Sequence, residues 1–262
     1  MKIVTVVSAK GGVGKTTLAA NLTSAIATPG QRVVAVDLDP SNALRLHFSV
    51  PLDNCDGLSR AELAGAPWHT AMIDCPNDVC VLAFGTLSEE QQFHFEQHLN
   101  AHPTWLARGL ADLPLGPSDI VILDTPPGSS AYTRAALNAA HFVLHVIFAD
   151  AASYAVIPQM QHMILRYAFP RQDFLGVGYV VNQGDPSRQL NQDVLRVLRA
   201  TLGTQLFPSV IHLDEGVREA LACNTTLIQY DPTCQAAADL RACGKWLRQT
   251  LDEAAKVQRG VK

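Results

Sequence analysis

The stretch Lys10-Gly-Gly-Val-Gly-Lys-Thr-Thr17 decides the fold of this chain. It follows an apolar, β-branched run at 3–7 and leads into a helical pattern at 15–27. Glycines let the backbone turn tightly so that its amide groups point inward, and the start of a helix adds a partial positive charge. This strand, loop and helix therefore predict a loop that binds an anion.

The Gly-Lys-Thr ending of the loop makes the prediction more specific. In P-loop NTPases, a lysine at this place reaches the β- and γ-phosphates, and the next hydroxyl binds Mg²⁺. We assign these roles to Lys15 and Thr16. The expected cofactors are ATP and Mg²⁺, and the expected activity is slow hydrolysis of ATP to ADP and phosphate.

Composition limits the number of domains and the classes of partner that the chain can have. The chain has 262 residues, of which 48% are apolar and 17% charged, so it can bury a sizeable core. We expect a single domain at 1–255 and a disordered tail at 256–262. The formal net charge of -4 offers no basic footprint for neutralising backbone phosphates, so binding to nucleic acid is disfavoured.

Apolar runs alternate with helical patterns along the whole chain. Runs without polar alternation are typical of strands covered on both faces. We therefore predict an α/β fold: a mostly parallel, doubly wound sheet flanked by helices on both faces, with its ligand at the carboxyl ends of the strands. The predicted strands are 3–7, 33–36, 79–84, 120–123, 142–148 and 174–181. The predicted helices are 15–27, 88–101, 130–140, 153–167, 187–202 and 235–255, with short helices and loops at about 48–78.

Cysteine spacing and hydropathy indicate the compartment. The six cysteines include no C-x-x-C pair, so they are typical of reduced thiols rather than of a zinc site. No apolar run approaches the ~20 residues that span a bilayer, and Met1-Lys2 leads directly into the first strand. We expect a cytoplasmic protein.

Acidic residues end two of the predicted strands. Asp37 and Asp39 follow the second strand, and Asp124 ends the apolar run 120–123. Two carboxylates next to phosphates need a cation, and an apolar strand that ends in an acid is typical of the Mg²⁺ site of P-loop enzymes. Asp37 alternatively caps a turn. Gly128 offers a flexible amide that could sense a γ-phosphate.

The loop also has an unusual start. Ala9 replaces the first glycine of the common pattern, and an extra lysine, Lys10, precedes the glycines. In this the chain resembles the MinD/ParA family. The resemblance implies that Lys10 crosses an ATP-bound homodimer to the partner's phosphates, that Asp39 orients or activates the attacking water, and that Asp37 supports the same segment.

The resemblance to the MinD/ParA family also covers the residues expected near the adenine base of the nucleotide. Asn182 ends another strand where the family places an asparagine against adenine, and a strand-ending turn is an equal alternative. His212 replaces the proline of the family's base-facing loop, which leaves the base contacts there open.

The predicted site residues form three sets. The catalytic residues are Lys10, Lys15 and Asp39. The nucleotide-binding residues are Lys10, Gly11, Gly12, Val13, Gly14, Lys15, Thr16, Thr17, Asp37, Gly128 and Asn182. The metal-binding residues are Thr16, Asp39 and Asp124.

Segments outside the loop resemble a narrower family, the bacterial cellulose-biosynthesis ATPases of MinD/ParA type. They are 39–48, 57–68, 82–91 and 211–215. The resemblance implies a factor of a cellulose secretion complex, recruited to the inner membrane or the cell pole. Its implied partners are a small protein of the same operon, a c-di-GMP-binding regulator and the synthase, with only indirect membrane contact. The alternatives are a partition or positioning ATPase acting on DNA or membrane, and an ATP-bound scaffold without turnover.

Two further sequence patterns can each be explained either by a structural role or by a functional one. His94, His98 and His102 recur every four residues, as a metal site or a polar helix face would require. The apolar positions between Leu240 and Leu251 have helical spacing, which suits a last helix packed on the sheet or an amphipathic membrane anchor.

Overall fold

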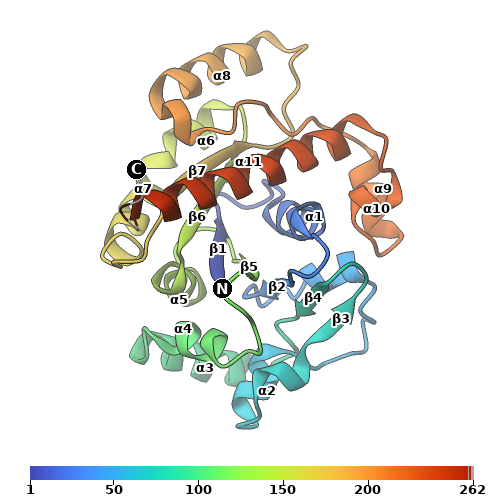
Figure 1. Ribbon diagram of the computed structural model, residues 1–262, viewed down its shortest axis with the longest axis vertical. Helices are drawn as coiled ribbons and strands as arrows, with labels where there is room; N and C mark the ends of the chain where they lie inside the picture. Colours follow the sequence, from blue (N-terminus) through green and yellow to red (C-terminus); the bar gives the residue numbers. More distant parts are fainter. Residues whose placement is uncertain (259, 261–262) are drawn as a thin grey trace.

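A computed structural model describes residues 1–258 and 260 of the protein (Figure 1). Within these residues, seven strands form one sheet in the order β3-β4-β2-β5-β1-β6-β7. All neighbouring strands run parallel except β3, which is antiparallel to β4. The strands are β1 (Lys2–Val7), β2 (Val33–Asp37), β3 (Ile73–Cys75), β4 (Val79–Leu82), β5 (Ile120–Asp124), β6 (Phe142–Ile147) and β7 (Gly176–Val181). This confirms the predicted fold class.

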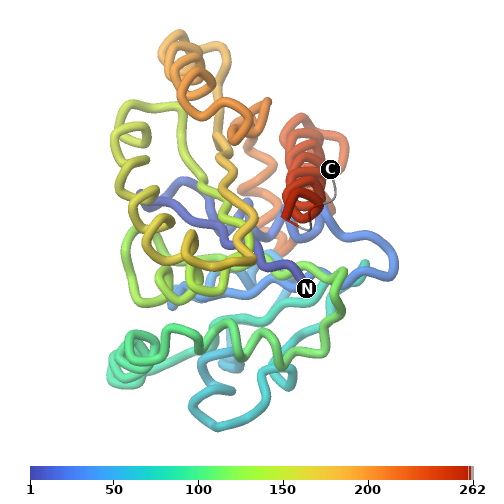
Figure 2. Tube along the Cα trace, turned by 60° about the vertical axis from the view of Figure 1, so that its left-hand side comes forward, coloured from blue at the N-terminus to red at the C-terminus, as the bar shows by residue number. Residues whose placement is uncertain are grey.

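Helices cover both faces of the sheet. The α-helices are α1 (Lys15–Ile26), α2 (Leu58–Leu63), α3 (Glu89–Ala101), α4 (Trp105–Ala111), α5 (Ala131–Ala139), α6 (Ala151–Ala155), α7 (Ile157–Tyr167), α8 (Gln189–Leu202), α9 (Gly216–Ala222), α10 (Leu227–Tyr230) and α11 (Gln235–Gln258). Three short 3₁₀ helices are η1 (Leu44–Phe48), η2 (Trp68–Ala71) and η3 (Gly203–Gln205). In Figure 2, α11 and α7 lie on opposite sides of β1.

The core follows from the side-chain alternation of the strands. Val4 and Val6 of β1 face α1 and α11, whereas Ile3 faces the cluster that contains α3, α4 and α5. Successive side chains of a strand point to opposite faces, so strands covered on both sides must be apolar at every position. The central strands β2 and β5 are buried at all their residues, which explains why the sequence showed them as continuous apolar runs.

The structure differs from the predicted elements at a few places. The edge strand β3 was not predicted, because three residues with alternating burial give no periodic signal. The predicted helix 153–167 is two helices that meet at Val156. Pro158 has no backbone N–H and therefore fits only the first turn of a helix, here that of α7. The segment 48–78 carries the short helices that we expected.

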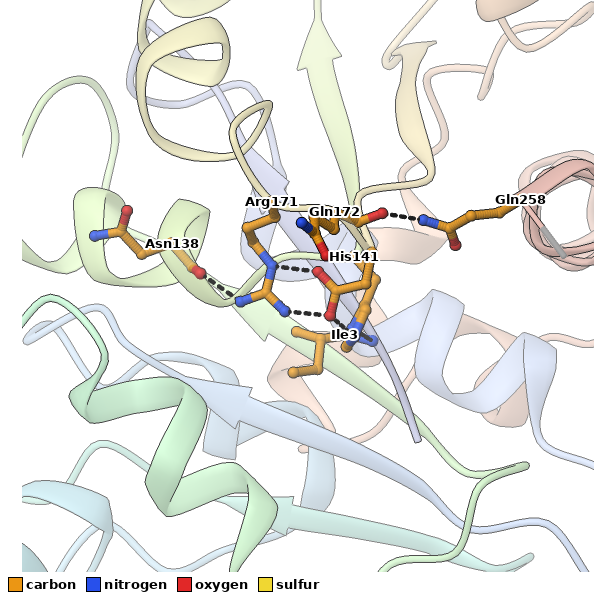
Figure 3. A network of polar contacts seen from close by, with 7 residues as sticks. Ile3, Asn138, His141, Arg171, Gln172 and Gln258 are labelled. Carbon is orange, nitrogen blue, oxygen red and sulfur yellow. Dashed lines mark hydrogen bonds and ion pairs between the residues drawn. The ribbon is translucent and has the colours of Figure 1, made fainter.

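Helix α11 packs on the body of the protein. Its stripe of Leu240, Cys243, Leu247 and Leu251 is buried against α1 and the sheet, which confirms the packed reading of this helix. The predicted tail is wrong at 256–258, because the helix continues to Gln258, whose amide donates to the carbonyl of Gln172 (Figure 3). Residues 259, 261 and 262 lie outside the described residues.

No helix in the described part of the chain is long and apolar enough to cross a membrane.

A polar network joins the segments at the amino ends of β1 and β6, on the side of the sheet opposite the phosphate loop (Figure 3). Arg171 donates two hydrogen bonds to Asp173, at 2.8 and 2.7 Å, and a third to the carbonyl of Asn138. The His141 Nδ1 accepts from the amide of Ile3 at 3.0 Å, and its Nε2 lies 3.3 Å from Asp173. Because Nδ1 accepts a hydrogen bond, the neutral ring carries its hydrogen on Nε2. Burial lowers the pKa of His141.

We predict that His145 makes the fold sensitive to acid. This histidine of β6 is fully buried, neither ring nitrogen has a hydrogen-bond partner among the described residues, and burial lowers its pKa from 6.5 to about 3. Between these two values the unfolded chain binds a proton that the folded chain does not. Stability therefore falls as pH falls through 6.5, by about 2 kcal/mol at pH 5.

Urea unfolding at pH 8 and pH 5 checks this. His145→Leu should lose about 2 kcal/mol less than the wild type between these pH values. The control His162→Leu, at an exposed position of α7, should behave like the wild type. An equal acid loss in all three proteins would contradict the prediction.

Candidate functional site

The loop between β1 and α1 has the geometry of an anion site. Gly12 and Gly14 have φ of 74° and 81°, in the left-handed region that favours glycine. Gly14 is the N-cap of α1, and no side chain caps this helix, so the amide groups of its first turn have no side-chain partner there. Such free amides, together with the helix dipole, attract negative charge.

Lys15 lies at the carboxyl edge of the sheet with its side chain buried. It is only 6% exposed, and burial lowers its pKa, while the charges of Asp124 and Asp39 oppose this shift. The three predicted residues are thus close enough to interact electrostatically. A buried cation beside two carboxylates is what a phosphate site with a bound metal requires.

Asp37 and Asp124 sit side by side at the ends of β2 and β5, where they are direct partners in the parallel register. Both are fully buried. Asp37 accepts from the amides of Asp39 at 2.8 Å and Leu44 at 3.1 Å, so it fixes the turn after β2. This geometry favours the alternative that Asp37 caps the turn. Both of its oxygens accept backbone amides, so the neighbouring residues are better candidates for a direct contact with phosphate.

Asp124 has the donor set of a cation site. Neither of its carboxylate oxygens has a hydrogen-bond partner of normal geometry among the described residues. Burial raises its pKa, with a further increase from Asp39, while the Thr16 hydroxyl and the Lys15 charge lower it. An unpartnered buried carboxylate beside a hydroxyl supplies the hard oxygen ligands that Mg²⁺ prefers. The residues Thr16, Asp39 and Asp124 therefore fit a magnesium ion.

The loop after β5 contacts the phosphate loop directly. The Gly128 amide donates to the carbonyl of Ser8 at 2.8 Å, and a Cβ at Gly11 would lie 3.8 Å from Pro127. The predicted amide of Gly128 is therefore already engaged. A γ-phosphate could reach it only if this hydrogen bond breaks, so the bond couples the two loops.

Lys10 points to an acidic partner that the sequence analysis missed. Its Nζ lies 3.5 Å from Asp150 Oδ2, and both side chains are half-exposed. Asp150 also caps α6 by accepting from the Ser153 amide at 2.6 Å. An acid three residues past the end of β6 and three residues before Ser153 was the available signal, because aspartate is a favoured N-cap residue.

Asn182 forms a hydrogen bond with the phosphate loop. Its side-chain amide donates to the carbonyl of Val13 at 2.8 Å, and a Cβ at Gly14 would overlap its Nδ2 atom. It also lines a cleft with Gln183, and the cleft continues to the segment at 211–214. One of its two amide N–H groups is engaged by the loop, so its second N–H and its oxygen remain available to a ligand.

The histidines at 94, 98 and 102, in α3 and at its C-terminal cap, do not form a metal site. His98 and His102 stack on each other with ring centres 4.3 Å apart, and the His98 Nε2 lies 3.8 Å from Glu62. No group of three or more His, Cys, Asp or Glu side chains that could hold a metal ion occurs in residues 1–258 and 260. These rings line a cavity of about 660 Å³ between η2 and α4 that is separate from the phosphate loop.

Fold and site together define a P-loop protein of the MinD/ParA type. Two solved structures with this fold are the septum site-determining protein MinD of Pyrococcus horikoshii complexed with Mg-ADP, at TM-score 0.74 and 23% identity over 98% of both chains, and a Borrelia burgdorferi plasmid partition protein bound to AMPPNP, at TM-score 0.78 and 15% identity. The Borrelia match covers 95% of this chain and 98% of the other.

The chain belongs to the BcsQ family, described as cellulose biosynthesis protein BcsQ, whose family model matches residues 1–247. It is 28% identical to the cellulose biosynthesis protein BcsQ of Escherichia coli over 238 residues, which are 90% of each chain. It is also 26% identical to the chromosome partitioning protein ParA of Caulobacter vibrioides, over 98% of this chain and 97% of that protein.

We predict that Gly14→Ala disrupts the phosphate loop without unfolding the protein. An alanine at positive φ costs about 1–2 kcal/mol, and its Cβ would also displace Asn182 from the loop. Gly30→Ala is a matched control, because Gly30 has a similar φ of 78° but no atom within 4 Å of the added Cβ.

Thermal unfolding and nucleoside triphosphate binding check this. Both variants should lose stability, Gly14→Ala more than Gly30→Ala because it also displaces Asn182, and only Gly14→Ala should lose affinity, by about 10-fold or more. Unchanged affinity in Gly14→Ala would contradict the prediction.

Proposed function

We propose that this chain is the ATP-binding and ATP-hydrolysing switch of a bacterial cellulose synthesis and secretion machinery. The observation that carries the proposal is the pair of buried charges at the sheet edge. Lys15 lies buried beside the glycine loop, and the unpartnered carboxylate of Asp124 lies in its electrostatic reach. Membership in the BcsQ family supports the cellulose role.

A magnesium nucleotide fits this charge pattern. The backbone amides of the glycine loop and the positive end of α1 favour a bound anion. The MinD structure of P. horikoshii holds Mg-ADP, which supports the same ligand here. A bound Mg²⁺ would neutralise the phosphate charge and screen it from Asp124.

The residues of this chain then act in defined ways. The loop amides and Lys15 would hold the β- and γ-phosphates, while Thr16, Asp39 and Asp124 would hold the cation. Asp39 accepts from the Ser41 amide at 2.9 Å through one oxygen, Oδ1. Its carboxylate orients the attacking water and accepts its proton during hydrolysis.

In the proposed function, ATP binding leads to dimerisation. Lys10 is half-exposed, and its contact with Asp150 at 3.5 Å is a long surface ion pair of little strength. Lys10 can therefore leave Asp150 and cross to the phosphates of a second copy, where it stabilises the charge of the transition state. After hydrolysis, the loop at Gly128 and the turn after β2 relax, and the dimer separates.

The dimer would dock the other proteins of the secretion machinery. We propose the small protein of the same operon, a c-di-GMP-binding regulator and the synthase as partners. Recruitment of the dimer from the cytoplasm to the inner membrane or the cell pole would then be indirect, through these proteins. The net charge of -4 disfavours the alternative of a DNA partition ATPase.

We expect Lys15→Ala to abolish both nucleotide binding and cellulose output. The substitution removes the buried cation that faces the phosphates and leaves Asp124 without its nearest positive charge. Calorimetry with Mg-ATP measures binding, and cellulose is measured in cells whose own gene is replaced by the variant. The exposed Lys245→Ala is the control and should match the wild type in both. Normal cellulose with Lys15→Ala would contradict the switch role.

We expect Asp39→Ala to trap an ATP dimer. Loss of the carboxylate that orients the water should lower phosphate release by about 10²-fold or more, while the phosphates stay bound. Size-exclusion chromatography in saturating ATP should then show a stable dimer. Lys10→Ala should bind ATP and stay monomeric, and the exposed Asp53→Ala should behave like the wild type.

A monomeric Asp39→Ala protein in saturating ATP would contradict this mechanism. If the wild-type protein forms the ATP dimer but releases no phosphate, the chain is instead a scaffold that holds ATP without turnover.

A further inference from the structure

The cavity between η2 and α4 has the size of a ligand site. Its volume of about 660 Å³ lies within the range of about 300–1,000 Å³ that is typical of sites for small molecules. It is bounded by the segment from the end of α2 through η2, by the end of α3 and by α4. These helices lie together at one end of the molecule, and α8 lies at the other (Figure 1). The residues that line this cavity are all different from those of the cleft beside the phosphate loop.

Two indole rings form a firm wall of this cavity. Trp68 and Trp105 line it with their ring centres 4.8 Å apart, and they are only 7% and 8% exposed. The Trp68 Nε1 donates to Glu62 Oε2 at 2.9 Å, and its ring lies so close to Gly109 that an added Cβ there would overlap it. Trp105 packs edge-on against Phe95, with 5.4 Å between the ring centres. The wall is therefore already ordered, so a ligand that packs on it does not lose affinity by ordering it.

Several polar groups of the cavity are available to a ligand. Arg108 and Asp112 are exposed, and only their backbone groups form hydrogen bonds within residues 1–258 and 260. Glu62 binds the indole through Oε2, and its Oε1 lies 3.8 Å from His98 Nε2, which is beyond hydrogen-bond distance. The His102 Nδ1 donates to the His98 carbonyl at 3.0 Å, so the Nε2 of the neutral ring is an acceptor. The lining thus combines the donors of one guanidinium with three acceptor groups.

The charges of the lining disfavour a charged ligand. With its histidines neutral, the lining carries two carboxylates, those of Glu62 and Asp112, and one guanidinium, that of Arg108. An anion would be repelled by the two acids, and a cation would leave the guanidinium donors unmatched. A hydroxyl group both donates and accepts, so a ligand with several hydroxyls satisfies the donors and the acceptors together.

Sugar rings combine such hydroxyls with apolar C–H faces. The C–H faces can pack on indole rings, while the hydroxyls around the ring reach polar side chains. We propose that the cavity between η2 and α4 binds a small uncharged saccharide. Trp68 and Trp105 form its apolar wall, and Glu62, Arg108 and Asp112 are its hydrogen-bonding partners. This site is separate from the proposed nucleotide site and does not depend on it.

Calorimetric titration at pH 8 with cellobiose and with maltose, two neutral disaccharides, tests the proposal. At least one of them should bind saturably, with a dissociation constant of about 1 mM or lower. Choline, a cation, and gluconate, an anion with several hydroxyls, should not bind at the same concentrations. Tryptophan fluorescence should change with the same midpoint as the heat signal. Trp246→Phe should retain this change, because Trp246 lies outside the cavity.

Two variants test the two parts of the site. Arg108→Ala alters only an exposed side chain and should weaken disaccharide binding by about 10-fold. Arg199→Ala, at an exposed position of α8, is the matched control and should bind like the wild type. Gly109→Ala places a methyl group against the Trp68 ring and displaces the wall, so it should weaken binding by about 10-fold or more. Circular dichroism checks that each variant is folded.

The proposal is overturned if neither disaccharide binds saturably, or if choline or gluconate binds in their place. Equal disaccharide affinity in the wild type and in Arg108→Ala would put the bound sugar elsewhere on the protein and would also overturn it. The titrations contain no nucleotide, so each of these results leaves the proposed nucleotide-binding function standing.

Discussion

Two carboxylates that are buried side by side at the ends of β2 and β5 constrain the rest of this structure. Asp37 and Asp124 are partners in the sheet register and are fully buried, and burial raises the pKa of each. The fold tolerates them because Asp37 is satisfied by two backbone amides and because Lys15 faces Asp124. Neither Asp124 oxygen has a hydrogen-bond partner of normal geometry within residues 1–258 and 260, which leaves this carboxylate available to the proposed cation.

The loops at this edge depend on one another through single contacts to the phosphate loop. The Gly128 amide binds the carbonyl of Ser8, the Asn182 side chain binds that of Val13, and Asp150 pairs with Lys10. Each contact comes from the loop after a different strand. Phosphates entering the loop would compete with these partners, so one ligand can move several loops. The proposed switch function would use this coupling between the loops.

Behind the site, the helices hold the loop in place. Helix α11 buries its apolar stripe against α1, whose first turn forms the phosphate loop. The same helix supplies Asp239, which fixes His212 on the opposite side of the cleft. One C-terminal helix thus supports both the glycine loop and the far side of the cleft beside it. This is consistent with a family match that covers residues 1–247 rather than the loop alone.

The sequence alone determined the parallel sheet, the phosphate loop and the acids around it. Those features depend on local patterns: continuous apolar runs, closely spaced glycines and acidic residues at the ends of strands. Only the tertiary structure decided that Asp150 meets Lys10, that Asp239 fixes His212 and that Gly128 is engaged by Ser8. These pairs join residues 27 to 140 positions apart, and no spacing rule predicts which strand ends and helices the fold brings together.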